Sequence, residues 1–412
     1  MNEHLAEEQK KKFLSGFISG ILLMALLFGA IYIGKQIYVL YLYKQASVST
    51  ESKQEAVTGI DTNRKMQIIE NTIDQYYLDE VEPEKLQDGI YYGMVEALDD
   101  PYSTYYSAED LVKMQQETQG IYYGIGAYVG MDKDTGLCTI SGVIEETPAQ
   151  EAGLRTGDVI YKVDGVSTQG METTDVVALI KGEENTTVHL TIARENENDF
   201  LELDVVRRKI ENPTVNYEMK ENGIAYIQIT EFDEVTTDQF TEALAVCKGS
   251  DMKGLILDLR SNPGGNLNVV CEIARKLLPK GMIVYTEDKY GQREEYTCDG
   301  TNQITVPMVV LVNGYSASAS EILSGAIKDY GIGTLMGTKT FGKGIVQRII
   351  PLSDGSALKL TVSKYYTPNG KNIHGVGIEP DEVVEFDAEA YYDKGIDNQL
   401  DAAVEFLKEK IE

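Results

Sequence analysis

The sequence predicts a multidomain α/β protein with an N-terminal transmembrane helix. The chain has 412 residues, which is more than one ordinary domain holds. Strand and helix patterns alternate over residues 211–390, as is typical of a mostly parallel sheet covered by helices. An apolar run without any charge, residues 13–34, is long enough to cross a bilayer. Together these features indicate a membrane-attached chain of two or three domains.

The apolar run follows three lysines, Lys10, Lys11 and Lys12. Because positive charge favours the cytoplasmic side, we expect residues 1–12 to stay in the cytoplasm and the rest of this single-pass chain to lie on the extracytoplasmic side of the cell membrane. A cleaved signal peptide is the alternative, but the apolar core is long and no A-x-A-like site directly follows it. Residues 35–63 are expected to form a linker, because they are mostly polar from about residue 45 onwards.

Two regions have helical periodicity outside the α/β part. Residues 64–118 show apolar faces at Ile68, Ile69 and Ile73, and at Leu86, Ile90, Met94 and Leu98; Ser107 is a candidate helix cap. The C-terminal region, 391–412, has an amphipathic helix with Leu400, Ala403, Val404 and Leu407 on one face. We expect these regions to pack on another domain or on a second copy, which makes a homodimer a candidate arrangement.

Composition restricts the chemistry. The net charge of −29 argues against nucleic-acid binding, which needs basic patches. The four cysteines form no CxxC pair and are too few for a disulfide scaffold, and their pairing stays open: Cys138, Cys247, Cys271 and Cys298. The three histidines, His4, His189 and His374, give little support for a histidine-based triad or a metal site.

Residues 119–210 change to short strands and glycine turns. Residues 146–166 contain the pattern TPA-x-x-AGL-x-x-GD, and a helix is expected over 173–181. This region resembles a PDZ domain of the protease-associated type. The resemblance implies that a loop binds the terminal carboxylate of a peptide through backbone N–H groups, and that the next strand accepts the peptide by edge addition. The loop comprises Tyr123, Gly124, Ile125 and Gly126.

The α/β part, residues 211–390, supplies the candidate chemistry. Its strands are expected at 224–229, 254–259, 308–312, 334–337, 345–350 and 357–366, and its helices at 236–247 and 267–278. Ligand sites in such sheets lie at the carboxyl ends of strands. Two glycine-bearing or small-residue segments end strands here, DLRSNPGG at 258–265 and NGYSASASE at 313–321.

One of three serines, Ser316, Ser318 or Ser320, is expected where a strand gives way to a helix. A hydroxyl at that position meets the positive end of the helix and its free N–H groups, which suits a nucleophile. Ser318 and Glu321 also fit a capping box, in which the serine only satisfies backbone donors. The residues alone leave both interpretations open.

Two further segments carry alternatives of the same kind. Gly264 and Gly265 are either half of an oxyanion hole or a simple turn. Lys343, between two glycines in the apolar segment TFGKGIV, is either a solvated turn residue or a general base. A lysine acts as a base only if burial lowers the pKa of its amine towards neutrality.

Taken together, these motifs are similar to those of the C-terminal processing peptidases, also called tail-specific proteases. The resemblance rests on NGYSASASEI, TFGKGIVQ, DLRSNPGG, the upstream PDZ-like region and LDDPYSTYY at 98–106, and spans roughly residues 64–408. It implies a serine–lysine dyad of Ser318 and Lys343, with Gln347 holding the lysine amine. It also implies an oxyanion hole formed by the N–H of Ala319 and that of Gly264 or Gly265.

The implied activity is that of a serine endopeptidase that cleaves protein or peptide substrates with apolar C-termini through an acyl-enzyme, without a metal or other cofactor. Two other function classes compete: a catalytically silent, membrane-tethered PDZ adaptor, and an acyl-thioester or ligand-binding protein. The adaptor predicts a degenerate dyad, and the ligand-binding protein needs a basic nucleotide site that the acidic composition disfavours.

One geometric condition applies to Gln347. Residues four apart in an extended strand lie about 13 Å from each other. Gln347 therefore contacts Lys343 only if Gly342 and Gly344 bend the segment or if its first part is not extended.

Overall fold

The computed structural model describes residues 57–132 and 135–411, and these described residues divide into two units between Pro83 and Glu84. The first unit contributes helix α2 (Ile60–Tyr76), which has no buried residue. It begins inside the expected linker, four residues before the predicted helical region.

The prediction of a transmembrane helix is wrong, and so is the predicted single-pass location at the cell membrane. Within the described ranges, no helix combines the length and the apolar character that a bilayer crossing requires. The longest described helix, α2, has 17 residues and includes Asp61, Arg64 and Lys65, whereas a span needs about 20 mainly apolar residues. Residues 13–34, on which the prediction rested, lie outside the described part of the chain.

The second unit opens with helices α3 (Pro83–Glu96) and α4 (Ala108–Gln119) and the short strand β1 (Thr104–Tyr106) between them. α3 ends shortly before Asp99, Asp100 and Pro101, as predicted. Ser107 caps α4, because its hydroxyl accepts a hydrogen bond of 3.1 Å from the Asp110 N–H. Strand β1 is not predicted by the sequence pattern, and it pairs antiparallel with a strand more than 250 residues later.

The PDZ-like part is a small sheet with two helices. Its strand order is β3 (Ala127–Met131), β4 (Cys138–Val143), β5 (Val159–Val163), β7 (Thr187–Ala193) and β8 (Leu201–Val206), with β6 (Val166–Ser167) beside β5. Helices α5 (Pro148–Glu151) and α6 (Thr173–Ile180) complete it around a buried cluster that includes Ile140, Ile160 and Leu190. Strands β2 (Ile121–Gly124) and β9 (Arg208–Glu211) pair antiparallel where the chain enters and leaves this part. β3 is an end strand of the sheet.

The α/β part confirms the mostly parallel sheet. The strand order is β10 (Val215–Met219), β11 (Ile224–Ile229), β12 (Gly254–Asp258), β15 (Met308–Val312), β16 (Thr334–Gly337) and β19 (Glu382–Val383), and β10 pairs antiparallel while the others run parallel. A 3₁₀ turn, η1 (Glu221–Gly223), joins β10 to β11.

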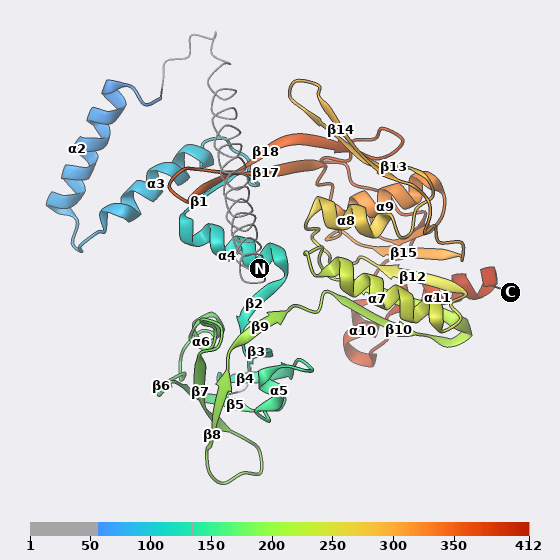
Figure 1. The fold of residues 1–412 in the computed structure, drawn as a ribbon, viewed down its shortest axis with the longest axis horizontal. Helices are drawn as coiled ribbons and strands as arrows, with labels where there is room; N and C mark the ends of the chain where they lie inside the picture. The colour runs from blue at the N-terminus through green and yellow to red at the C-terminus, as the bar shows by residue number, and fades with distance from the viewer. Residues whose placement is uncertain (1–56, 133–134, 412) are drawn as a thin grey trace, which may run out of the picture. The chain divides into compact units, whose positions relative to one another are not determined.

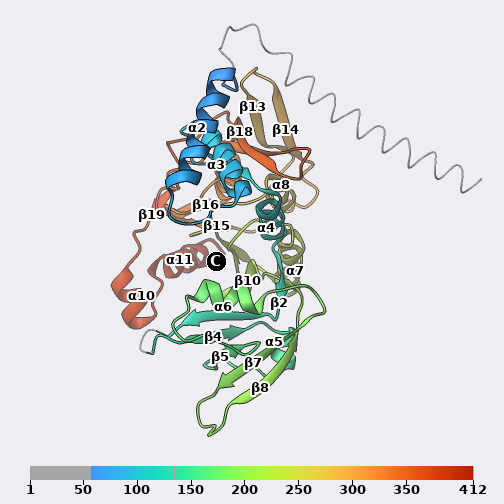
Figure 2. The same ribbon diagram turned by 90° about the vertical axis from the view of Figure 1, so that its left-hand side faces the viewer.

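Helices cover both faces of this sheet (Figures 1 and 2). One face packs against α7 (Thr236–Gly249), α8 (Leu267–Ala274) and α9 (Ala319–Tyr330). The other face packs against α11 (Asn398–Ile411), which follows α10 (Ala388–Lys394). The predicted amphipathic face of the last helix is correct, since Ala403 and Leu407 are fully buried there.

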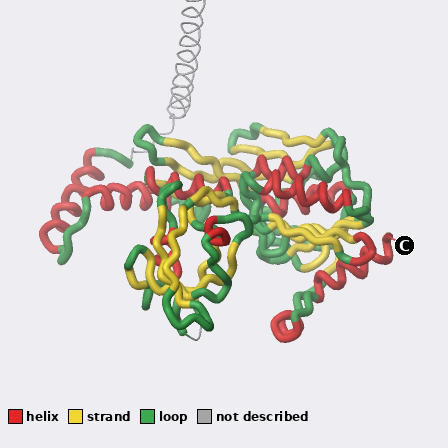
Figure 3. Tube along the Cα trace, turned by 60° about the horizontal axis from the view of Figure 1, so that its bottom comes forward, coloured by secondary structure: helices red, strands yellow, loops and turns green. Residues whose placement is uncertain are grey.

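A second sheet, wholly antiparallel, is not predicted. It contains β1, β13 (Gly281–Asp288), β14 (Arg293–Cys298), β17 (Ile345–Pro351) and β18 (Ala357–Tyr366). The strands expected at 345–350 and 357–366 exist, but they pair with each other in this sheet and do not extend the parallel one. Helices α8 and α9 lie between the two groups of strands (Figure 3).

Candidate active site

The three serines of the turn after β15 have different surroundings. Ser316 is fully buried and donates a hydrogen bond of 2.7 Å to the Leu259 carbonyl. Ser320 is also fully buried and donates one of 3.0 Å to the Asn262 carbonyl. Both therefore fix the turn to the DLRSNPGG loop. Of the three, Ser318 alone is partly exposed, so it is the one serine of this turn that is accessible from solvent.

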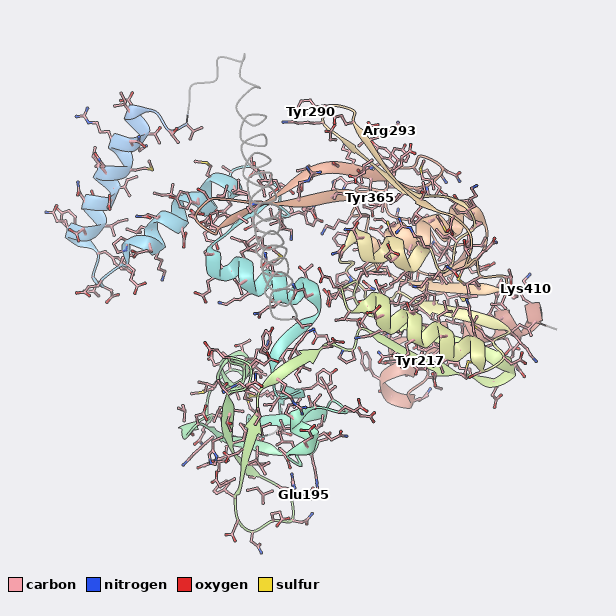
Figure 4. All side chains as sticks on the ribbon, viewed as in Figure 1. Glu195, Tyr217, Tyr290, Arg293, Tyr365 and Lys410 are labelled. Atoms are coloured by element: carbon pink, nitrogen blue, oxygen red, sulfur yellow. The ribbon has the colours of Figure 1, made fainter. Side chains whose placement is uncertain are left out.

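Ser318 is the residue immediately before α9, and its backbone is strained. Its φ is 53° and its ψ −111°, whereas a helix N-cap usually has an extended backbone and non-glycine residues rarely adopt positive φ. Strain of this kind persists only where the surrounding contacts impose it, and it is frequent at active sites. The Tyr365 hydroxyl contributes by donating to the Ser318 carbonyl at 3.1 Å; Figure 4 labels this tyrosine.

Of the capping box predicted for Ser318 and Glu321, the glutamate half is formed, because the Glu321 side chain accepts from the Ser318 N–H at 3.0 Å. Among the described residues, the Ser318 hydroxyl accepts no capping hydrogen bond. The Glu321 carboxylate also accepts from the N–H groups of Gly342 and Lys343, both at 2.8 Å, and from the Thr340 hydroxyl at 2.6 Å. Glu321 is fully buried, and burial raises the pKa of its carboxyl although these four donors oppose the shift. One buried carboxylate thus joins the serine turn to the lysine segment.

Sequence reasoning assigned Glu321 only to helix capping and missed this connection. A signal was present, because a glutamate in the mostly apolar or small-residue run SASASEILSGAI needs buried partners. Those partners lie about 20 positions along the chain, where no local pattern indicates them.

Lys343 is partly buried, with its amine 4.4 Å from the centroid of the Tyr102 ring. Burial lowers the pKa of this amine, and the nearby charge of Lys359 lowers it further, while Asp100 and Glu321 act in the opposite direction. The solvated-turn interpretation is therefore the weaker one. The surroundings favour the neutral amine more than water does.

Gln347 enters the site through an irregularity in β17. The register of β17 against β18 shifts between Val346 and Gln347, and Lys343 lies before the strand begins. Gly342 has a φ of +91°, so the first part of the segment is not extended. The Gln347 amide donates to the Thr361 hydroxyl at 3.2 Å, and no hydrogen bond joins it to Lys343 within the described residues.

A cleft of about 550 Å³ brings most of the predicted residues together. Its lining includes Ser318, Ala319, Lys343, Gln347 and Gly265, and Tyr365 lies there as well. Residues from helix α4 and from the segment around Asp233 form another part of its wall. The cleft therefore holds a hydroxyl, an amine of lowered pKa, a side-chain amide and the N-terminal end of a helix.

The two glycines of NPGG differ in their contacts. A Cβ on Gly264 would lie 2.8 Å from the Ser318 Cβ, so a glycine is needed for this close approach. The N–H of Gly264 donates to the Asn262 side chain at 2.8 Å, whereas the N–H of Gly265 has no hydrogen-bond partner within the described ranges. Ala319 is the first residue of α9, so its N–H is one of the unpaired donors of a helix N-terminus.

The predicted carboxylate-binding loop is only partly a loop. Tyr123 and Gly124 belong to strand β2, while Ile125 is buried and Gly126 has a φ of +83°. A Cβ on Gly126 would lie 2.3 Å from the Thr147 Cβ, which explains the glycine. The strand that follows, β3, pairs with β4 on one side, and within the described residues its other edge has no strand partner.

The histidines and cysteines of the described residues do not line the cleft. His189 is exposed on β7 and hydrogen-bonds to Asp204 and Glu202, and His374 is exposed. The four cysteines are buried and free. In the part of the chain that the structure describes, no cluster of His, Cys, Asp or Glu is arranged to hold a metal ion.

Comparison with known proteins gives matches to three family models. The model described as "Peptidase family S41" matches residues 223–384, the model "PDZ domain" matches residues 139–194, and the model "Activating protease CtpB N-terminal domain" matches residues 24–110. These matches cover the α/β part, the middle of the PDZ-like part and the N-terminal helical region.

Two relatives and one solved structure are similar over most of the chain. The carboxy-terminal processing protease CtpA of Bacillus subtilis (strain 168) is 37% identical over 342 residues, which cover 83% of this chain and 73% of that protein. The carboxyl-terminal-processing protease of Synechocystis sp. is 38% identical over 296 residues, 71% of this chain and 69% of that protein. The solved photosystem II D1 C-terminal processing protease is 31% identical, with a TM-score of 0.46, and the match covers 79% of this chain and 88% of that chain. The identity and coverage of the two relatives show that the chain belongs to the carboxy-terminal processing proteases, a family of serine proteases with a PDZ domain and an S41 peptidase domain.

Proposed function

We propose that the chain hydrolyses peptide bonds of protein substrates with Ser318 as the nucleophile and Lys343 as the general base. The observation that carries the proposal is that both residues line one cleft, Ser318 on a strained backbone at the start of α9 and Lys343 with an amine whose pKa is lowered by burial. A nucleophilic hydroxyl needs a neighbouring base, and an uncharged amine meets that need.

In the first half of the reaction, the neutral Lys343 amine takes the proton from the Ser318 hydroxyl as Oγ bonds to the carbonyl carbon of the substrate. The carbonyl oxygen becomes an oxyanion, which the N–H of Ala319 at the positive end of α9 stabilises. Among the described residues the N–H of Gly265 has no partner, which supports it as the second donor over Gly264, whose N–H donates to Asn262. The C–N bond then breaks, and the Lys343 ammonium returns its proton to the leaving amine.

In the second half, water attacks the ester carbon of the acyl-enzyme. Lys343 takes a proton from this water and later gives one to Ser318 Oγ, which restores both groups and releases the new C-terminus. Gln347 lines the same cleft and is assigned to orient the lysine amine during these transfers. In the described conformation its amide is bonded to Thr361, so this role requires the side chain to turn towards Lys343.

The decisive experiment compares Ser318→Ala and Lys343→Ala in the full chain with a matched control, Lys339→Ala. Lys339 lies in the same segment, but half of its side chain is exposed and it pairs with Glu379 on the surface. Each active-site variant should lower kcat by about 10³-fold or more for a peptide with an apolar C-terminus, because the two groups act as a unit. The control should keep wild-type turnover. Cleavage products detected by mass spectrometry at near wild-type rates in either active-site variant would refute the dyad, whereas a wild-type chain that cleaves no such peptide would favour the silent adaptor.

The PDZ domain is proposed to bind the apolar C-terminal tail of the substrate. The free edge of β3 supports this, because a peptide strand can add to it with its carboxylate at the turn formed by Ile125 and Gly126. Binding of a fluorescent apolar peptide to the Ser318→Ala chain should weaken by about tenfold or more when the peptide C-terminus is amidated. Equal affinity for the two peptides would show that the terminal carboxylate is not recognised.

A homodimer through residues 57–98 is also proposed. Helix α2 has no buried residue, and Ile68 and Ile69 are about half exposed, at 58% and 49%. An apolar helix face of this kind is expected to be covered in the functional protein. The C-terminal helix is no longer a candidate contact, because α11 already buries its apolar face against the sheet.

A further inference from the structure

The motif LDDPYSTYY, which the dyad does not include, forms a tight turn beside the active-site cleft. The carboxylate of Asp100 accepts hydrogen bonds from the Tyr102 N–H at 3.2 Å and from the Ser103 hydroxyl at 2.6 Å. Pro101 restricts the backbone between them. The conformation of the turn is thus fixed by its own side chains.

The turn is anchored to β18, next to the cleft. The Ser103 hydroxyl accepts a hydrogen bond of 3.1 Å from the Thr361 N–H, and the Thr361 hydroxyl accepts the amide of Gln347 at 3.2 Å. Strand β1 then continues the pairing with β18, placing Thr104 opposite Lys359. A segment from the start of the second unit therefore pairs with β18 and is connected, through Thr361, to Gln347 on β17.

This anchoring puts the Tyr102 ring on the lysine. The Lys343 Nζ lies 4.4 Å from the ring centroid, inside the range in which an aromatic face attracts a cation. The attraction acts on the ammonium and largely disappears when the amine is neutral. The ring also covers part of a side chain that would otherwise be more exposed to water.

Charged groups from three other elements face the same amine. Lys359 on β18 disfavours the ammonium, while Asp100 in the turn and Glu321 on α9 favour it, and burial disfavours it most strongly. Because these contributions oppose one another, a modest change in one contact is sufficient to change the pKa of the Lys343 amine.

We propose that Tyr102 is a positioning residue for Lys343: its ring seats the lysine ammonium at the edge of the cleft, and the Asp100–Ser103 turn holds the ring in place. Loss of the proton weakens the attraction to the ring, but the ring still packs on the lysine side chain and keeps the neutral amine directed towards Ser318. The inference rests on the proposed role of Lys343 as the base. It assigns a function to a segment more than 200 residues away from the dyad in sequence.

The test compares Tyr102→Leu and Tyr102→Phe in the full chain. Leucine keeps apolar bulk but removes the aromatic face, so the ammonium loses its stabilisation. The acid limb of the kcat/KM profile should then move to lower pH by about 0.5 to 1 unit. The plateau kcat should fall about 10- to 100-fold because the amine is misplaced, with little change in KM. Phenylalanine keeps the ring, so its profile should match the wild type, with kcat within about threefold.

A readout without turnover separates this inference from the dyad itself. In the Ser318→Ala chain, the pH dependence of Lys343 acetylation by acetic anhydride, followed by mass spectrometry, reports the titration of the amine. Adding Tyr102→Leu should shift that titration to lower pH. The matched control is Tyr290→Leu, which removes a surface Lys–Tyr contact of 5.0 Å at the tip of the β13–β14 hairpin (Figure 4) and should change nothing.

A wild-type titration and kcat in Tyr102→Leu, or an equal loss in Tyr102→Phe and Tyr102→Leu, would overturn the inference. If Tyr102→Leu does not fold, Ser103→Ala serves in its place, since it removes the anchor to Thr361 and should shift the titration in the same direction by a smaller amount. Should Lys343→Ala remain active, the proposed function fails and not the contact itself, because the acetylation titration still reports it.

Discussion

At the scale of single residues, the amine of Lys343 predicts a defined pH dependence. Burial and the charge of Lys359 lower its pKa below the ordinary lysine value of about 10.4. The fraction of neutral base therefore rises with pH, and kcat/KM should rise with pH up to a plateau. Lys359→Met removes a neighbouring positive charge, so the pKa of Lys343 rises and the acid limb should move to higher pH.

The matched control for this pH prediction is Lys364→Met on the same strand, where the side chain is exposed. It should leave the profile in place. An acid limb that does not move in Lys359→Met, or a flat profile between mildly acidic and alkaline pH, would contradict a lysine base. The measurement is kcat/KM for one peptide across the pH range, with thermal unfolding as the check on folding.

Glu321 supports a second prediction at this scale. All four partners of its carboxylate are donors, so a glutamine at this position would point its own NH₂ group at two of them. Glu321→Gln should reduce the free energy of unfolding by about 1 to 3 kcal/mol, the cost of buried donors left unpaired. It should also lower kcat by about tenfold or more, because the Ser318 turn and the Lys343 segment lose their common anchor.

The control for Glu321 is the same substitution at an exposed position. The Glu379 side chain is 68% exposed and pairs with Lys339, so Glu379→Gln should change stability by less than about 0.5 kcal/mol. Urea denaturation and steady-state kinetics of both variants provide the comparison. If Glu321→Gln behaves like Glu379→Gln, the buried carboxylate has no organising role.

At the scale of elements, the strands that can be predicted from sequence are those whose own residues form a distinct apolar or β-branched run. Strands β11, β15, β16 and β18 were predicted with their observed bounds, because each is a distinct run of apolar or β-branched residues. Strand β1 and the β13–β14 hairpin were missed, since their stability depends on partners that a local window does not contain.

The same distinction applies to the candidate site. Ser318, Lys343 and Gln347 were predicted from motifs, and all three line one cleft, while their catalytic roles stay predictions. Tyr102 and the wider role of Glu321 were not predicted, because their contacts join segments separated by long stretches of sequence. The spacing of residues does not show which loops meet at the carboxyl ends of the strands.

The C-terminal helix α11 provides a prediction at the element scale. Asp397 precedes the helix, accepts the Leu400 N–H at 3.0 Å, and pairs with Arg260 at 2.7 Å in the DLRSNPGG loop. Burial raises the pKa of Asp397, but the hydrogen bonds that it accepts from Arg260 and from the Leu400 and Gln399 N–H groups, together with the charge of Arg260, outweigh burial, so the pKa is lowered. The stabilisation is therefore present at neutral pH and is lost as the pH falls through that lowered pKa.

Asp397→Ala should reduce the free energy of unfolding by about 2 kcal/mol, because it removes both the cap and a charge partner of Arg260. Asp397→Asn keeps a capping oxygen and should cost about half as much. Asp401→Asn, an exposed position in the first turn of the same helix, should change stability by less than about 0.5 kcal/mol. Equal urea-unfolding midpoints for all three variants would show that α11 is held by its apolar face alone.

At the scale of the whole molecule, the cleft is assembled from segments that are widely separated in the chain. The 98–106 segment, the NPGG turn, the start of α9 and the loop before β17 each contribute to the same group of contacts. Both layers of strands are needed, because Ser318 follows a strand of the parallel sheet and Gln347 lies in the antiparallel one. Proteolytic function therefore depends on the packing of the two sheets around α8 and α9.

The last prediction is that the chain forms a homodimer through the helices of residues 57–98. If a second copy covers the apolar face of α2, a charge placed there should separate the subunits, since burying an ionised side chain without a partner is unfavourable. Sedimentation of the purified chain should give the mass of a dimer, and Ile68→Glu with Ile69→Glu should give that of a monomer. Val246→Glu is the control, because this α7 side chain is 44% exposed, close to the 49% of Ile69, and lies outside the proposed contact. A wild-type chain that sediments as a monomer, or a double variant that stays dimeric, would exclude α2 as the contact.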